Sequence, residues 1–254
     1  MEIDLKSKFD VLINKFLDIK KRGYIRGVNN NKINSCGLTF EALLGKKADS
    51  KYLPDYEGIE IKCKQRYSRY EIGLFSLAFD GPSRYEAHDL LKKYGKRNSL
   101  FSRRKTLIVT LRMRERIKCY KYYFELNIDK EKEQIYVNVY NKYGRFLEKR
   151  CFLNFQSIKN RIEIKLSNMA LIRASKKEEN GNLYFRYYKI TCYSLKSLSG
   201  FISAIENGDV ICTIMLRYGR SGKELGKNKN KNMMFSIAED RLCKIYNKVY
   251  EYGE

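Results

Sequence analysis

The chain has 254 residues, 43% of them hydrophobic, which allows one large domain or two lobes and excludes a disordered protein. No stretch approaches the ~20 apolar residues of a membrane span, and the charged N-terminus lacks the apolar region of a signal peptide, so we expect a cytoplasmic protein. Lysine and arginine number 52 against 29 aspartates and glutamates, and this net charge of +23 is typical of proteins with a polyanionic partner.

Charge alone does not decide the partner. Ribosomal and membrane-surface proteins are also basic, and a solvated lysine-rich surface gives the same balance. The single histidine, His88, excludes the nuclease classes that need more than one histidine. Seven cysteines without a C-x-x-C pair indicate reduced thiols rather than a zinc site. Any hydrolytic chemistry is therefore expected to use carboxylates, lysine and a metal ion.

The N-terminal part of the chain is expected to form two helices and a strand. Residues 3–21 place apolar side chains at helical spacing and predict an amphipathic helix. After a Gly- and Asn-rich loop, a short helix carries Phe40 on its apolar face and ends at Gly45. Pro54 opens a turn, and residues 59–64 alternate apolar and polar side chains as a strand does.

The rest of the chain is expected to be rich in strands, which makes a mixed α/β protein (α+β). Strand patterns cover residues 107–114, 120–126, 134–140, 161–166, 169–174, 184–193 and 210–218. A helix is expected over residues 195–207, a basic loop over residues 219–232 and a closing helix over residues 237–252.

One short segment carries the residues of a metal-dependent hydrolase. Alternate side chains of a strand share a face, so Glu60 and Lys62 lie side by side with Cα atoms about 6.6 Å apart. A tight turn through Gly58 brings Asp55 back beside Glu60. The two carboxylates and the carbonyl oxygen of Ile61 suit Mg²⁺. Lys62 would then orient a water and stabilise the charge that develops in phosphodiester hydrolysis.

This motif is weak evidence by itself, because an ordinary edge strand with solvated Glu and Lys has the same pattern. Residues 163–165 repeat the E-x-K alternation without an upstream Pro-Asp, and we expect them to form a structural strand with a charged outer face. Glu41 borders the apolar stripe of its helix and can reach the same site, although a salt bridge to a lysine is an equal alternative. Lys64 and Arg66 extend the strand with positive charge that suits the phosphates flanking a cut.

Several motifs support one another. They are Gly23-Tyr24-Ile25, the C-G-L-T-F-E-A-L-L-G stretch of residues 36–45, Pro54-Asp55, the G-I-E-I-K stretch of residues 58–62, and residues 201–208 and 214–219. Together they resemble the MvaI/BcnI group of type II restriction endonucleases, relatives of the nicking enzyme MutH in the PD-(D/E)xK superfamily. The likeness covers both ends of the chain and is far more specific than E-x-K alone.

The resemblance implies a restriction-endonuclease-like core in a bilobal clamp around a DNA cleft. Residues 1–150 would form mainly the catalytic lobe and residues 151–254 mainly the recognition lobe, with interleaving of the lobes allowed. Its implied metal ligands are Asp55 and Glu60, with Lys62 as the catalytic lysine and Glu41 as an accessory acid.

The same resemblance implies a sequence-specific enzyme. The expected protein is a monomer that cuts double-stranded DNA with Mg²⁺ at a short CCNGG-like site, and its one active site nicks each strand in turn. A cognate DNA methyltransferase is expected in the same cell, as in any restriction–modification pair. A MutH-like nicking or repair enzyme and a non-catalytic DNA-binding protein with a relict nuclease fold are the alternatives.

The basic segment after residues 210–218 departs from the group, because it lacks the histidines with which the group contacts bases. Its candidate DNA-binding residues are Arg217, Arg220, Lys223, Lys227, Asn228, Lys229, Asn230 and Lys231. Such side chains can read base edges, but a solvated loop that holds phosphates without sequence preference is equally open.

Overall fold

The computed structural model describes residues 2–30, 33–46, 53–83, 85–98, 101–218 and 228–253. The chain forms two compact units, each built from separate stretches. The first comprises Met1–Ile72, Ile162–Lys196 and Ile245–Glu254, and the second comprises Gly73–Arg161 and Ser197–Lys244. The two units interleave along the chain, because one sheet combines strands from the beginning, middle and end of the chain.

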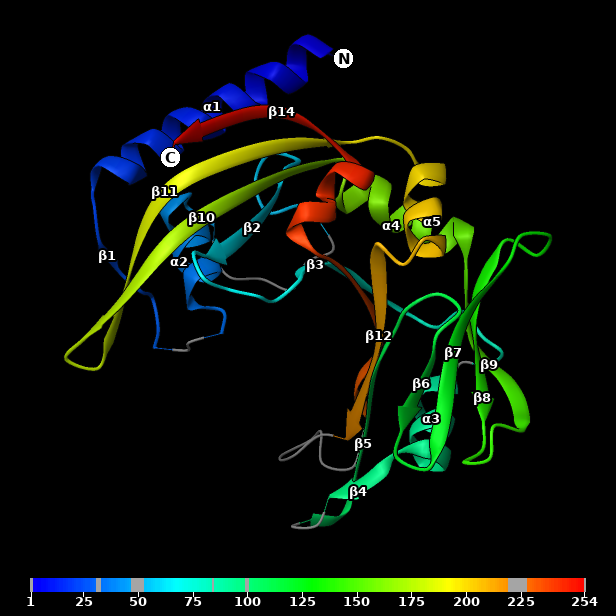
Figure 1. The fold of residues 1–254 in the computed structure, drawn as a ribbon. Coiled ribbons are helices and arrows are strands. Elements are labelled where there is room, and N and C mark those ends of the chain that lie inside the picture. The colour runs from blue at the N-terminus through cyan, green and yellow to red at the C-terminus, as the bar shows by residue number, and fades with distance from the viewer. Residues whose placement is uncertain are drawn as a thin grey trace. The chain divides into compact units, whose positions relative to one another are not determined.

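The first unit is a mixed sheet with helices packed against it (Figure 1). Its elements are α1 (Glu2–Lys21), β1 (Ile25–Arg26), α2 (Ser35–Leu43), β2 (Glu60–Gln65), β10 (Asn168–Glu179), β11 (Asn182–Leu195) and β14 (Tyr246–Gly253). The strand order is β1-β11-β10-β2, with β14 also paired to β11. β2, the strand that carries the acidic motif, lies at the end of this order and runs parallel to its neighbour β10.

A single apolar core joins the helices to this sheet. Phe9 and Phe16 of α1 and Phe40 of α2 are fully buried and pack with Ile61 of β2 and Tyr187 of β11. The helical spacing of Phe9 and Phe16 and the strand alternation around Ile61 are the patterns on which these elements were expected. The expected α1, α2 and β2 are therefore confirmed.

The second unit contains two sheets. The first has the order β3-β13-β12-β5-β4 and is made of β3 (Ile72–Ala78), β13 (Asn228–Ile237), β12 (Val210–Tyr218), β5 (Phe101–Leu111) and β4 (Lys96–Asn98). The second is the antiparallel series β6 (Arg116–Cys119), β7 (Tyr122–Asp129), β8 (Gln134–Tyr140) and β9 (Phe146–Asn154). Its helices are α3 (Glu86–Tyr94), α5 (Leu198–Glu206) and the 3₁₀ helix η2 (Glu239–Lys244). The helix α4 (Phe155–Lys165) passes from this unit into the first.

The mixed α+β class is confirmed, and most of the expected strands are present. β8 and β12 have the expected bounds, β10 and β11 contain the expected ranges, and α5 lies within the range of the helix expected before Gly208. Several elements were not foreseen, namely β3, α3, β4, β6 and β9. The short α3 is an example of an element that the sequence pattern did not reveal. Its buried apolar residues, Ala87, Leu90, Leu91 and Tyr94, are interspersed with charged residues.

Three expectations about local structure were wrong. Residues 161–166 are not a strand but mostly the end of α4, because Ile158, Ile162 and Leu166 are all buried at helical spacing. The closing helix expected over residues 237–252 is replaced by the 3₁₀ helix η2 and the strand β14. Only β14 pairs with β11. The last part of the expected basic loop, from Asn228, is the start of β13, paired with β12.

Two predicted absences concern membranes and disulfides. Among the helices that the structure describes, none is long and apolar enough to cross a membrane. All seven cysteines are free thiols, and only Cys243 is exposed. The expectation that the cysteines are mostly buried is confirmed.

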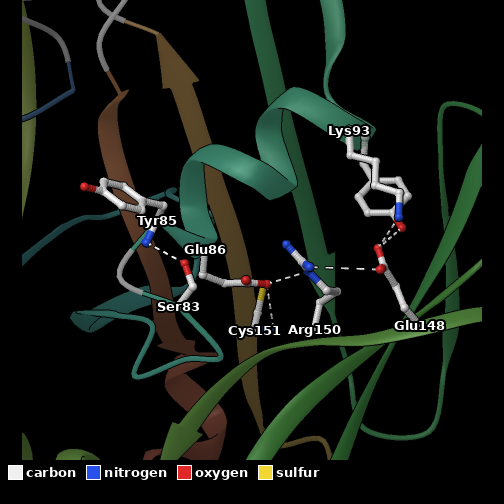
Figure 2. Close-up of polar contacts among 8 residues, drawn as sticks. Ser83, Tyr85, Glu86, Lys93, Glu148, Arg150 and Cys151 are labelled. Atoms are coloured by element: carbon white, nitrogen blue, oxygen red, sulfur yellow. Dashed lines mark hydrogen bonds and ion pairs between the residues drawn. The ribbon is translucent and has the colours of Figure 1, made fainter.

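A buried ion-pair network ties α3 to β9 in the second unit (Figure 2). Glu86, only 1% exposed, accepts a hydrogen bond from the Cys151 N–H at 3.1 Å and pairs with the Arg150 Nε at 2.8 Å. Glu148 accepts hydrogen bonds from Lys93, at 2.9 Å, and from the Tyr94 hydroxyl. Carboxylates buried in this way are tolerated because each has a cation and a hydrogen-bond donor.

Glu86→Ala is expected to lower the free energy of unfolding by about 2–4 kcal/mol, because it leaves Arg150 and the Cys151 N–H without their carboxylate. Urea unfolding followed by circular dichroism measures the change. Glu115→Ala, at an exposed position of the same unit, is the matched control, with a change within about 0.5 kcal/mol. Equal stabilities of the two variants would contradict this account of the network.

Candidate active site

A tight turn folds the acidic motif back on itself at the start of β2. Tyr56 and Ile59 exchange backbone hydrogen bonds of 3.0 and 2.7 Å, and the two residues between them, Glu57 and Gly58, have φ angles of +46° and +83°. Positive φ at both central positions defines a type I′ turn, where glycine is favoured. The turn expected through Gly58 is therefore present, and it returns Asp55 to the side of β2.

Asp55 is fixed in place by two donors. Its Oδ2 accepts the Ile61 N–H at 3.0 Å, and its Oδ1 accepts the Lys46 Nζ at 2.7 Å. Burial by itself raises the pKa of Asp55, but the hydrogen bonds from Lys46 and Ile61 outweigh it and hold that pKa below its usual value. Asp55 is thus an ionised carboxylate held next to the first residues of β2.

Glu60 is the most enclosed carboxylate of the motif. Its side chain is 2% exposed, and its Oε1 lies 2.7 Å from the Lys62 Nζ and 3.3 Å from the Lys165 Nζ. Its Oε2 is buried and, within the part of the chain that the structure describes, has no hydrogen-bond partner. Burial raises the pKa of Glu60 despite the neighbouring Lys62. A buried acceptor without a donor is available to a ligand.

Glu41 reaches the same cluster from α2. The helix is anchored by the Tyr187 hydroxyl, which donates to the Cys36 carbonyl at 2.8 Å, and by the buried Phe40. Burial, followed by the negative charge of Asp55, raises the pKa of the Glu41 carboxyl. The structure therefore brings Glu41 near Asp55, Glu60 and Lys62, and Lys46 also lies close enough to lower its pKa.

The residues present fit a small hard cation. In the described ranges no group of three or more His, Cys, Asp or Glu side chains forms a metal cage by itself. Asp55 and Glu60 supply carboxylate oxygens, and one of these, Oε2 of Glu60, is buried and has no hydrogen-bond partner in the described part of the chain. The N–H and carbonyl of one strand residue point to the same side, so the Ile61 carbonyl faces the side of Asp55, as its N–H does. Such an all-oxygen donor set suits Mg²⁺.

Beyond Lys62, the same face of the sheet is positively charged. Lys64 of β2 pairs in register with Arg173 of β10, which pairs with Lys189 of β11. Side chains of paired residues share a face, and alternation places Lys64 on the face of Glu60 and Lys62. Like charges on neighbouring strands repel each other, and Lys189 of this row also has a carboxylate partner, Glu251, at 3.2 Å. Arg66 follows near the end of β2 and lies 5.9 Å from the ring centre of Tyr188.

The structure describes only part of the basic segment after β12. Arg217 lies on β12 in the second unit, paired with Asn230. Asn228, Lys229, Asn230 and Lys231 belong to β13. Arg220, Lys223 and Lys227 lie outside the described residues. A role of these residues in reading DNA stays a prediction.

Two site residues were missed by sequence reasoning. Lys46, which contacts Asp55, directly follows the Gly45 that ends α2 and had no role in the motif. Lys165, which contacts Glu60, belongs to the E-x-K repeat at residues 163–165 that was expected to be a structural strand. The helical spacing of Ile158, Ile162 and Leu166 was the signal that could have placed Lys165 on the last turn of a helix.

Comparisons with known proteins agree with this architecture. The family model described as the MvaI/BcnI restriction endonuclease family matches residues 13–246. The structure is similar to that of restriction endonuclease MvaI in complex with its cognate DNA substrate, with a TM-score of 0.85 and 25% identity over 94% of this chain and 96% of that one. MvaI in the absence of DNA matches with a TM-score of 0.62 and 25% identity, over 95% of this chain and 96% of that one. No curated protein sequence matches.

Proposed function

Because the chain belongs to the MvaI/BcnI restriction endonuclease family, we propose that it hydrolyses phosphodiester bonds of double-stranded DNA with Mg²⁺ at the site around Asp55 and Glu60. One observation carries the proposal. Two carboxylates from opposite sides of a type I′ turn meet beside a lysine, and the more buried of them has an oxygen without a hydrogen-bond partner among the described residues. These are the parts that metal-assisted phosphodiester hydrolysis requires.

The chain's residues divide the work of this reaction. Asp55 and Glu60, with the Ile61 carbonyl, would hold the ion. When bound, the Mg²⁺ neutralises phosphate charge and lowers the pKa of a water ligand. Lys62, 2.7 Å from Glu60, places an ammonium group beside the reacting phosphate and its attacking water. Glu41, whose pKa burial and Asp55 raise, would act as the accessory acid of the site.

Similarity to the MvaI complex with cognate DNA supports a duplex as the substrate. We propose a cytoplasmic monomer that binds a short CCNGG-like site and nicks the two strands in turn, accompanied in its cell by a cognate methyltransferase. Arg217, Arg220, Lys223, Lys227 and Asn228 to Lys231 would contact the DNA. Mapping the cut sites of an Arg217→Ala variant tests this point, since an unchanged target and rate would exclude a base contact by Arg217.

Digestion of a plasmid of known sequence with Mg²⁺ tests the proposed function. The expected time course converts supercoiled DNA first to open circles and then to linear molecules, whose ends map to one short sequence. A product that stays nicked at any incubation time would favour the MutH-like alternative. Binding without any strand cleavage would favour a relict nuclease.

The cationic row on the active-site face is proposed to hold DNA phosphates. Replacing Lys64 and Arg173 by alanine should weaken binding to unrelated duplexes and reduce the slope of log K against log salt by about 1 for each phosphate that the protein no longer holds. Fluorescence anisotropy with a short duplex over a salt series measures this slope. Lys21→Ala removes a charge from an exposed position of α1 and should leave the slope unchanged. Equal slopes for all three proteins would remove the row from the DNA contact surface.

A further inference from the structure

Two lysines converge on one oxygen of Glu60. The Lys62 Nζ reaches Oε1 from β2 at 2.7 Å, and the Lys165 Nζ reaches the same oxygen from the end of α4 at 3.3 Å. Both side chains are largely buried, with 23% and 19% of their surface exposed. The other oxygen, Oε2, has neither a lysine nor, among the described residues, any hydrogen-bond donor. The two positive charges therefore gather on one side of this carboxylate.

The position of Lys165 is set by the fold. Ile158 and Ile162 bury one face of α4, and the Leu166 N–H continues the helix with a bond of 2.8 Å to the Ile162 carbonyl. The Tyr246 hydroxyl then donates to the Leu166 carbonyl at 3.2 Å, which fastens the end of the helix. Three residues later Met169 of β10 pairs in register with Glu60. Anchored on both sides, Lys165 is held beside the carboxylate instead of moving freely in solvent.

Among the residues that the structure describes, the charges of the cluster balance without a metal ion. The carboxylates are Glu41, Asp55 and Glu60, and the lysines are Lys46, Lys62 and Lys165. Three negative and three positive charges sum to zero. A divalent cation on Asp55 and Glu60 would add two positive charges to the same small volume, where low solvent exposure strengthens repulsion. An ammonium group on Glu60 Oε1 thus opposes the binding of a cation at Glu60.

We propose that Lys165 is a positioning residue of the active site, which holds the Glu60 carboxylate in the metal-free protein and is exchanged for the divalent ion when the site is loaded. The inference rests on the proposed function, because it takes Asp55 and Glu60 as metal ligands. Lys62 keeps its separate role beside the phosphate. Lys165 sets how readily the ion enters.

Mn²⁺ binding in the absence of DNA tests this role directly. At pH 8, electron paramagnetic resonance of free Mn²⁺ gives the dissociation constant without any cleavage reaction. Lys165→Met removes the competing charge and should tighten Mn²⁺ binding by about 3- to 10-fold. Lys165→Arg keeps the charge and should bind Mn²⁺ as the unmodified protein does. Lys21→Met removes one charge from the exposed end of α1 and should also leave the affinity unchanged.

The outcomes separate this inference from the function on which it rests. An unmodified protein that binds no Mn²⁺ would overturn the proposed metal site. Mn²⁺ binding by the unmodified protein, with unchanged or weaker binding by Lys165→Met, would overturn the exchange role alone, because a merely structural lysine loosens the site when it is removed. If Lys165→Met melts at a lower temperature, Lys165→Gln, which also removes the charge but keeps a hydrogen-bond donor, is measured and should bind Mn²⁺ more tightly as well.

Discussion

Asp55→Asn is expected to lower the rate of DNA cleavage by about 10³-fold, because it removes one of the two carboxylates that would hold the ion. The substitution is nearly isosteric. The side-chain oxygen of asparagine still accepts the Ile61 N–H, so the turn and β2 keep their geometry. The loss therefore reports the charge of Asp55 and not its packing.

Single-turnover cleavage of a labelled duplex, at an enzyme concentration that saturates binding, measures this rate. Asp18→Asn on α1, where the exposed carboxylate pairs with Lys21, is the matched control and should cleave normally. An Asp55→Asn protein that cleaved at the full rate would exclude this cluster as the active site.

Lys62→Met is expected to lower the same rate by about 10²- to 10³-fold, because it removes a positive charge placed beside the developing charge on the phosphate. Lys62→Arg should not restore the rate. The guanidinium is larger and planar, and the lysine it replaces is a compact charge 2.7 Å from a buried carboxylate.

A comparison of binding with cleavage identifies the step that fails. Lys62→Met is expected to bind duplex DNA within a few-fold of the unmodified protein, since phosphate contacts elsewhere supply most of the affinity. Loss of binding in parallel with loss of cleavage would instead assign Lys62 to DNA binding. Lys21→Met is the control for the removal of a lysine, with unchanged binding and rate.

Much of the active site could be predicted because its geometry is local. The alternation of Ile59, Glu60, Ile61 and Lys62 separates a core face from a polar face in any strand. Gly58 allows the left-handed conformation on which the turn depends, and so returns Asp55 to β2. The strand alternation and the turn involve only residues that are close neighbours in the sequence. They therefore form whatever packs around them.

The remaining errors arose where a short pattern fits two periodicities. Residues 161–166 alternate as a strand would, yet Ile158, Ile162 and Leu166 are also spaced as on a helix, and burial favoured the helix. The end of the chain has aromatic residues that suit either state, and pairing with β11 made it a strand. In each case the deciding interaction is with residues elsewhere in the chain. A local pattern carries no information about those residues.

The sequence by itself determined the turn and strand of the acidic motif, the core helices α1 and α2 and the family, because periodicity, turn chemistry and the order of motifs are properties of neighbouring residues. Only the tertiary structure decided that Lys46 holds Asp55 and that Lys165 shares Glu60 with Lys62. The lysine at residue 165 is more than a hundred residues from Glu60 in the chain and meets it because β10, which directly follows α4, pairs with β2. That pairing depends on long-range burial and strand register, which set the balance of charge around the two carboxylates.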